Sequence, residues 1–89
     1  MVARQVIVHG KVQGVFFRAS ARDKAVVLGL SGKVGNRADG SVELWLEGER
    51  EAVEDMTDWC RKGPSRAEVE RIEVMEKAPE GYTDFRIER

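Results

Sequence analysis

The chain has 89 residues, of which 42% are hydrophobic and 35% charged, and its formal net charge at pH 7 is -1. This length allows one small domain with one core, so we predict a single domain over residues 1–89. No apolar run approaches the roughly 20 residues of a membrane span, and a nearly neutral chain has no general attraction to nucleic acid. We therefore expect a protein that binds neither membrane nor nucleic acid. Because Arg4 and Gln5 interrupt any apolar signal-peptide segment, we also expect it to be cytoplasmic.

Disulfide and metal chemistry have little support in the sequence. The chain holds one cysteine, Cys60, and one histidine, His9. A lone cysteine forms no internal disulfide, and these two side chains are too few for a dedicated zinc site. We therefore expect no disulfide, no metal and no cofactor.

The first half of the chain reads as strand, loop, helix and hairpin. Residues 4–10 have the β-branched density of a strand. Residues 19–29 show apolar side chains at helical spacing and end at Gly29, a favoured C-cap residue. Residues 31–36 and 41–47 read as strands, and the Asp39-Gly40 pair between them predicts a hairpin turn.

The second half begins with the clearest helix pattern of the chain. Acidic residues from Glu49 onward suit its first turn, and a stripe of apolar side chains follows. Arg61 and Lys62 are predicted to close the last turn, before Gly63-Pro64 stops the helix. The charges therefore match the helix dipole at both ends.

Two more strands complete the predicted order. Residues 67–77 alternate except between Val69 and Ile72, where the slip predicts a β-bulge, and residues 82–88 form a short last strand. This order predicts an α+β, ferredoxin-like split βαβ sandwich: an antiparallel sheet of four to five strands, covered on one face by two helices. Right-handed crossovers place the first strand centrally, so the loop after it and the hairpin should border the same edge.

The loop after the first strand has the composition of an anion site. It reads Gly10-Lys11-Val12-Gln13-Gly14-Val15-Phe16-Phe17-Arg18 and leads into a helix. Backbone N–H groups at a helix N-terminus lack partners, and a guanidinium adds a planar fork that suits phosphate oxygens. We therefore interpret residues 12–18 as a phosphate cradle.

This motif resembles the first signature of the acylphosphatase family, G-x-V-Q-G-V-x-F/Y-R, at every fixed position from Gly10 to Arg18. The family's second signature, a spaced glycine, asparagine, glycine and valine, resembles residues 32–42, with Asn36 as the asparagine. Lys33 departs from the usual aromatic residue and Gly35 from a longer side chain. The resemblance spans the whole chain, implies a small stand-alone acylphosphatase, and implies the same ferredoxin-like fold.

The resemblance also implies a reaction, the hydrolysis of a small acyl phosphate to a carboxylate and inorganic phosphate. Arg18 and Asn36 would be the catalytic residues, with Asn36 orienting the attacking water. The phosphate-binding loop would comprise Gln13, Gly14, Val15, Phe16, Phe17 and Arg18. A carboxylate of pKa about 4 leaves without a general acid, so a metal is not required and a substrate oxygen can take the water proton. We expect the protein to be a monomer.

Plainer interpretations exist for single residues. Arg18, taken alone, suits a surface ion pair with Asp23 or Glu47, and Asn36 suits a turn. Val15 and Phe17 are typical packing residues. His9 alternates onto the other face of its strand, away from a catalytic position.

Three other functions compete with acyl phosphate hydrolysis. Cys60 and Arg66 have the C-x5-R spacing of cysteine-dependent phosphatases, but Cys60 falls near a helix C-terminus, where the dipole disfavours a thiolate. An RNA-binding sheet would need basic and aromatic side chains where Glu43 and Glu47 stand. The motif also occurs in the N-terminal part of hydrogenase maturation carbamoyltransferases, which are long chains, whereas this one is expected to stand alone.

Overall fold

The computed structural model describes residues 1–88, which form five strands and two helices. All five strands and both helices were expected from the sequence, with small shifts at their ends. In chain order the elements are β1 (Val2–Lys11), α1 (Phe17–Val27), β2 (Ser31–Asn36), β3 (Val42–Gly48), α2 (Arg50–Cys60), β4 (Glu68–Lys77) and β5 (Phe85–Glu88).

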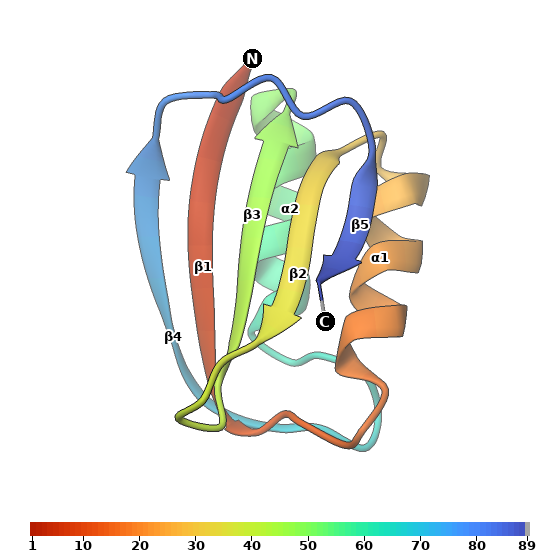
Figure 1. Ribbon diagram of the computed structural model, residues 1–89, viewed down its shortest axis with the longest axis vertical. Helices are drawn as coiled ribbons and strands as arrows, with labels where there is room; N and C mark the ends of the chain where they lie inside the picture. The colour runs from red at the N-terminus through yellow and green to blue at the C-terminus, as the bar shows by residue number, and fades with distance from the viewer. Residues whose placement is uncertain (89) are drawn as a thin grey trace.

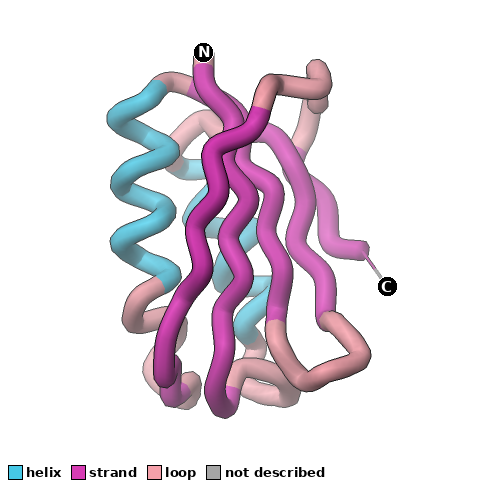
Figure 2. The backbone as a smooth tube through the Cα atoms, turned by 90° about the vertical axis from the view of Figure 1, so that its left-hand side faces the viewer, coloured by secondary structure: helices cyan, strands magenta, loops and turns pink. Residues whose placement is uncertain are grey.

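The strands form one sheet in the order β4-β1-β3-β2-β5. Neighbours from β4 to β2 are antiparallel, whereas β5 runs parallel to β2 and makes the sheet mixed. Each helix connects two parallel strands that another strand separates, which is the split βαβ arrangement. Both helices cover the same face of the sheet (Figures 1 and 2). The α+β, ferredoxin-like prediction is confirmed, with a parallel edge strand added.

The core lies between this face and the helices. Val6 and Val8 of β1 and Leu44 of β3 point into it and are fully buried. From α2 it receives Val53 and Met56, as the predicted stripe requires. Burial of this apolar surface, at roughly 25 cal/mol per Å², is the main force that holds helices and sheet together.

The predicted slip in β4 is a register shift opposite Gly10. His9 pairs with Arg71 and Gly10 with Val69, which leaves Glu70 as the extra residue of a bulge. Gly10 has φ +129°, and a Cβ there would lie 2.2 Å from the carbonyl oxygen of Glu68. Only glycine fits this close approach, which bends the strand immediately before the loop.

Several element boundaries differ from the sequence-based prediction by one to three residues. The first helix begins at Phe17 rather than residue 19, because Phe16 has φ 63° and serves as its N-cap. The second helix ends at Cys60, so Arg61 and Lys62 follow the last turn instead of closing it. The last strand begins at Phe85 rather than residue 82, because the amides of residues 80–82 donate to the Glu47 carboxylate.

None of the helices within residues 1–88 is both long and apolar enough to cross a membrane.

Candidate active site

The loop between β1 and α1 has a backbone shape that collects N–H groups. Gly14 has φ +74° and Phe16 has φ +63°, whereas Val15 between them is not left-handed. Alternation of this kind turns successive N–H groups to one side and forms a concave anion site. The first bond of α1 runs from the Ser20 amide to the Phe16 carbonyl, and no amide of residues 14–19 donates to a backbone carbonyl. These donors are therefore available to a ligand.

Arg18 lies in the first turn of α1, beside these amides, and its side chain is half-buried. The plainer interpretation, an ion pair with Asp23 or Glu47, is wrong. The Asp23 carboxylate forms an ion pair with Arg22, with 3.7 Å between Oδ1 and the guanidinium nitrogen. The Glu47 carboxylate accepts a hydrogen bond from the Glu80 amide. Among the ion pairs and hydrogen bonds within residues 1–88, none involves the Arg18 guanidinium. The guanidinium is therefore free to bind an external anion.

Asn36 is the last residue of β2 and is exposed. It shares with Arg18 a cleft of about 320 Å³ at the end of the sheet. Arg18 supplies the one charged group of the cleft, Asn36 supplies the one polar amide side chain, and the other lining residues are apolar or glycine. They are Val12, Gly14, Phe16, Phe17, Ala19 and Ile87. The fold thus brings the two predicted catalytic residues together, Arg18 from the first turn of α1 and Asn36 from the end of β2.

The loop side chains divide into anchors and free groups. Val15 and Phe17 are buried, and the Phe17 ring packs edge-on against Trp59 with ring centroids 5.3 Å apart. Phe16 is 70% exposed at the cleft. Gln13 points toward the β2–β3 hairpin, where its amide nitrogen donates to the carbonyls of Arg37 and Ser41. Apart from the exposed Phe16 ring, the loop therefore offers its backbone amides to a bound anion.

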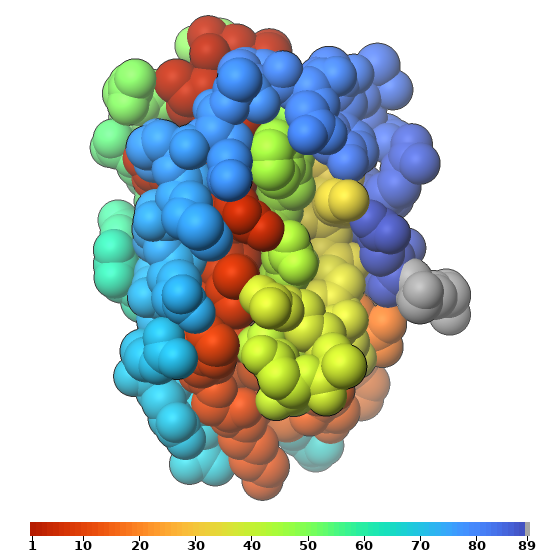
Figure 3. All heavy atoms as spheres, turned by 60° about the vertical axis from the view of Figure 1, so that its left-hand side comes forward, coloured from red at the N-terminus to blue at the C-terminus, as the bar shows by residue number. Residues whose placement is uncertain are grey.

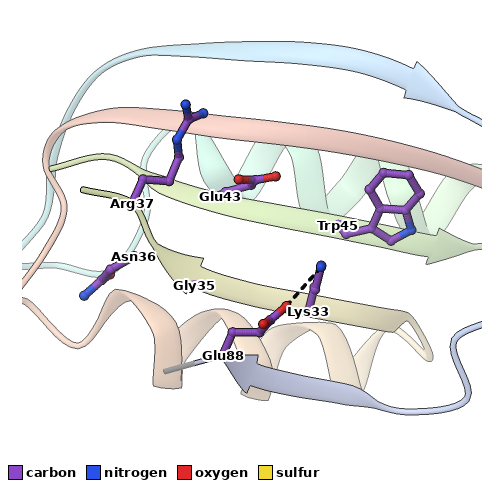
Figure 4. Close-up of a pocket in the computed structure, with 7 residues that line it drawn as sticks. All are labelled: Lys33, Gly35, Asn36, Arg37, Glu43, Trp45 and Glu88. Carbon is purple, nitrogen blue, oxygen red and sulfur yellow. Dashed lines mark ion pairs between the residues drawn. The ribbon is translucent and has the colours of Figure 1, made fainter. Parts of the chain in front are cut away.

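A second cavity, of about 210 Å³, lies on the sheet face that the helices leave open (Figure 4). It holds both positions that depart from the family pattern, Lys33 and Gly35. The Lys33 amine lies 3.0 Å from Glu88, an ion pair that raises the pKa of the lysine. In Figure 4 the Asn36 side chain points away from Glu43 and the rest of this cavity. The two departures therefore lie outside the cleft that holds Arg18.

The competing cysteine chemistry has no support in the geometry. Cys60 is fully buried at the end of α2, and its burial raises the pKa of the thiol to about 12. A thiol with that pKa is not a nucleophile at neutral pH. His9 lies on the open face and pairs with Glu73, so it is not a base for the cleft either.

Sequence reasoning missed one buried charge at the other end of the sheet. Glu47 was expected on the solvent-facing side, yet it is 1% exposed because the linker from β4 to β5 crosses it. Its carboxylate accepts hydrogen bonds from the Trp45 indole and from the amides of residues 80–82. Burial alone would raise the pKa of Glu47, but these donors outweigh it and lower the pKa. A single glutamate in a predicted strand does not reveal that a backbone amide 33 residues away will donate to it.

The fold and cleft define a small ferredoxin-like α+β protein that offers free amides, an unpaired arginine and an asparagine at one end of its sheet. The acylphosphatase family model matches residues 4–87. An acylphosphatase of Gloeobacter violaceus is 48% identical over 88 residues, which cover 99% of this chain and 95% of that protein. The crystal structure of acylphosphatase from Bacillus subtilis superposes with a TM-score of 0.96 at 36% identity, and each chain is fully covered. The chain belongs to the acylphosphatase family, enzymes that hydrolyse acyl phosphates, so the predicted family and enzyme class are confirmed.

The chain is also similar to one part of a much longer protein. It matches the HypF protein of T. kodakarensis with a TM-score of 0.83 at 37% identity, over 100% of this chain and 12% of that one. The same fold therefore also occurs as part of a longer chain.

Proposed function

We propose that this chain cleaves the carboxyl–phosphate bond of small acyl phosphates at the Arg18 cleft, without a metal or cofactor. The single observation that carries the proposal is the half-buried Arg18 guanidinium, which has no partner within residues 1–88 and lies beside the unbonded amides of the loop. A guanidinium without a protein partner keeps its N–H donors available to an external anion, which it can bind through two parallel hydrogen bonds.

The phosphoryl group is proposed to occupy the concave loop of residues 13–18. In phosphoryl transfer, negative charge spreads over three equatorial oxygens, and several N–H donors can hold these oxygens while the guanidinium fork binds two of them. The donors are fixed by the left-handed backbone at Gly14 and Phe16, so they need no rearrangement during the reaction. Catalysis would then rest on positioning and electrostatics.

The attacking water is proposed to lie on the Asn36 side of the phosphorus. The amide oxygen of Asn36 accepts one hydrogen bond from this water and so aims its lone pair. As the new P–O bond forms, the bond from phosphorus to the carboxyl oxygen breaks, and its electron pair leaves with the carboxylate. A phosphoryl oxygen takes the water proton, which gives dihydrogen phosphate without a protein base.

The leaving group explains why so few side chains suffice. A carboxylic acid has a pKa near 4, so its anion departs unprotonated at neutral pH. An ordinary phosphate ester releases an alkoxide, which needs a general acid that this cleft does not contain. We therefore expect acyl phosphates, carbamoyl phosphate included, to be substrates and simple phosphate monoesters to be inert.

The direct experiment measures phosphate release from benzoyl phosphate in the presence of a chelator. The wild type should turn over, whereas Arg18→Ala and Asn36→Ala should each lower kcat/KM by roughly 10²-fold or more, as expected for loss of a charge-stabilising or water-positioning group. Arg22→Ala is the matched control, because Arg22 lies on the same helix and contacts Asp23. A simple alkyl phosphate, whose leaving group is an alkoxide, tests the monoester prediction.

Two outcomes would contradict the proposal. Full activity of a folded Arg18→Ala variant would remove the guanidinium from the mechanism. Loss of wild-type activity on chelation, with recovery on adding a divalent cation, would show that a metal supplies the charge instead.

The remaining parts of the proposal concern context. We propose that residues 1–89 act as one domain, as a monomer and in the cytoplasm. Arg18 and Asn36 of one chain line the same cleft, so the pair needs no residue from a second copy. The one cysteine is buried and free, which suits a reducing compartment. Light scattering during gel filtration measures the mass, and a dimer at assay concentration would contradict the monomer.

A further inference from the structure

Gln13 makes two hydrogen bonds that join the two halves of the cleft. Its Nε2 atom donates to the carbonyl oxygen of Arg37 at 2.8 Å and to that of Ser41 at 2.9 Å. Gln13 belongs to the loop that precedes Arg18, and Arg37 directly follows Asn36. One half-buried side chain therefore spans from the anion-binding loop to the hairpin that carries the asparagine.

Within the described part of the chain, no other hydrogen bond or ion pair joins the hairpin to the loop. Its remaining bonds are internal: the Arg37 amide donates to Ser41, the Gly40 amide to Arg37, and the Ser41 amide to Asp39. The ladder between β1 and β3 ends at Val8 and Val42, before both segments. In Figure 3 the hairpin, coloured yellow-green, lies beside the red-orange end of β1. Gln13 is thus placed to set the distance between them.

The same bonds make the Gln13 side chain unsuitable as a phosphate ligand. Both N–H donors of its terminal amide are used by carbonyls, and because both partners are oxygens, it is the nitrogen that faces them. What remains is an amide oxygen, an acceptor that a phosphate would repel. The side chain therefore differs in role from the backbone amides that follow it.

We propose that Gln13 is a positioning residue that fixes Asn36, and with it the attacking water, relative to the phosphate held by Arg18 and the loop. This inference rests on the proposed function of Arg18 and Asn36. The Gln13 side chain contributes to the rate of the chemical step and little to phosphate binding. Its effect on turnover passes through Asn36.

The first experiment compares kcat with phosphate affinity in Gln13→Met, which keeps the side-chain length and loses both donors. We expect kcat for benzoyl phosphate to fall by about tenfold, as for the loss of two hydrogen bonds, while the inhibition constant of inorganic phosphate changes less than about twofold. Gln13→Glu should be slower than Gln13→Met, because a carboxylate would face two carbonyl oxygens. Gln5→Met is the matched control: Gln5 donates to Glu43 on the open face, so its loss should leave kcat unchanged.

The second experiment is a double-mutant cycle with Asn36→Ala. If Gln13 acts through Asn36, Gln13→Met should lower kcat in the wild-type background and change it less than about twofold in the Asn36→Ala background. A general loosening of the fold would instead lower kcat by the same factor in both backgrounds. Thermal unfolding of each variant identifies any that does not fold. If Gln13→Met does not fold, Gln13→Lys, which keeps N–H donors at this position, replaces it in the cycle.

The outcomes separate this inference from the function on which it rests. Full activity of Asn36→Ala would overturn the proposed role of that residue and the cycle with it. A large loss in Asn36→Ala, together with equal factors for Gln13→Met in both backgrounds, would overturn the positioning role of Gln13 alone. Weaker phosphate inhibition by tenfold or more in Gln13→Met, with kcat unchanged, would make Gln13 a ligand and would also overturn it.

Discussion

At one end of the sheet the Glu47 carboxylate accepts four hydrogen bonds, whereas at the opposite end the Arg18 guanidinium has no partner within residues 1–88. In Figure 1 the linker from β4 to β5 crosses the upper end, and the loop before α1 lies at the lower end beside the β2–β3 hairpin. The upper end satisfies its buried charge internally and so gains stability. The lower end leaves donors unbonded, which costs stability and creates binding capacity. Substitutions at the two ends should therefore affect different measurements.

The largest expected effect comes from Arg18→Lys, which keeps the charge and removes the planar fork. A lysine ammonium binds phosphate as a point charge and cannot hold two oxygens in one plane, so we expect kcat/KM for benzoyl phosphate to fall by roughly 10²-fold. The melting temperature should stay the same, since the guanidinium has no partner in the described chain. Arg22→Lys, one turn along α1, should change neither quantity. Wild-type kcat/KM in Arg18→Lys would show that charge alone suffices at this end.

Glu47→Gln should have the opposite profile, with a loss of stability and unchanged kcat/KM. The glutamine loses the charge that four donors contact, and its NH₂ group faces amide N–H groups. We expect the free energy of unfolding to fall by about 2 kcal/mol at pH 7. Denaturant unfolding measures this loss. Glu43→Gln, on the same strand and half-buried, is the control and should lose much less.

The stability difference between wild type and Glu47→Gln should also depend on pH. The pKa of Glu47 is lower in the folded protein than its ordinary value of 4.5, so the unfolded chain binds the proton more tightly. The stabilisation is then complete above about pH 4.5 and disappears as pH falls through the folded pKa. A difference that stayed constant down to pH 3 would show that hydrogen-bond geometry, and not charge, holds the linker.

The contrast between the ends also shows what the sequence could and could not predict. The grouping at the lower end was predictable, because Gly14 and Arg18 stand in one loop and Asn36 ends a strand that was expected to border the same edge. These residue types also suggest an anion site by themselves. The bulge opposite Gly10 was visible as a broken alternation in β4. The hydrogen bonds of Glu47 could not be predicted, because its partners in the linker are backbone amides, which no side chain identifies. The role of Gln13 was hidden for the same reason, since it binds two carbonyls.

The predicted start of the first helix was wrong because of the backbone geometry at Phe16. Periodicity placed the start of the first helix at residue 19, because apolar spacing begins with Ala21, but a left-handed Phe16 allows the turn to start at Phe17. A non-glycine residue with positive φ is uncommon, so propensity alone does not predict it. The shift matters for function, because it puts Arg18 inside the first turn, where the helix fixes its backbone. The last residues of the proposed phosphate-binding loop therefore belong to a helical turn.

The smallest effect is expected for Cys60→Ser, which tests whether any chemistry lies outside the lower end. The thiol is buried and its pKa is raised to about 12, so it should be un-ionised during turnover. We expect kcat/KM to stay within about twofold of wild type, with a stability loss of about 1 kcal/mol because a hydroxyl is buried in an apolar site. Cys60→Ala separates the two contributions, since it removes the sulfur without adding a polar group. If both variants fold and neither turns over, the thiol takes part in the chemistry, and the free donors beside Arg18 are not sufficient for it.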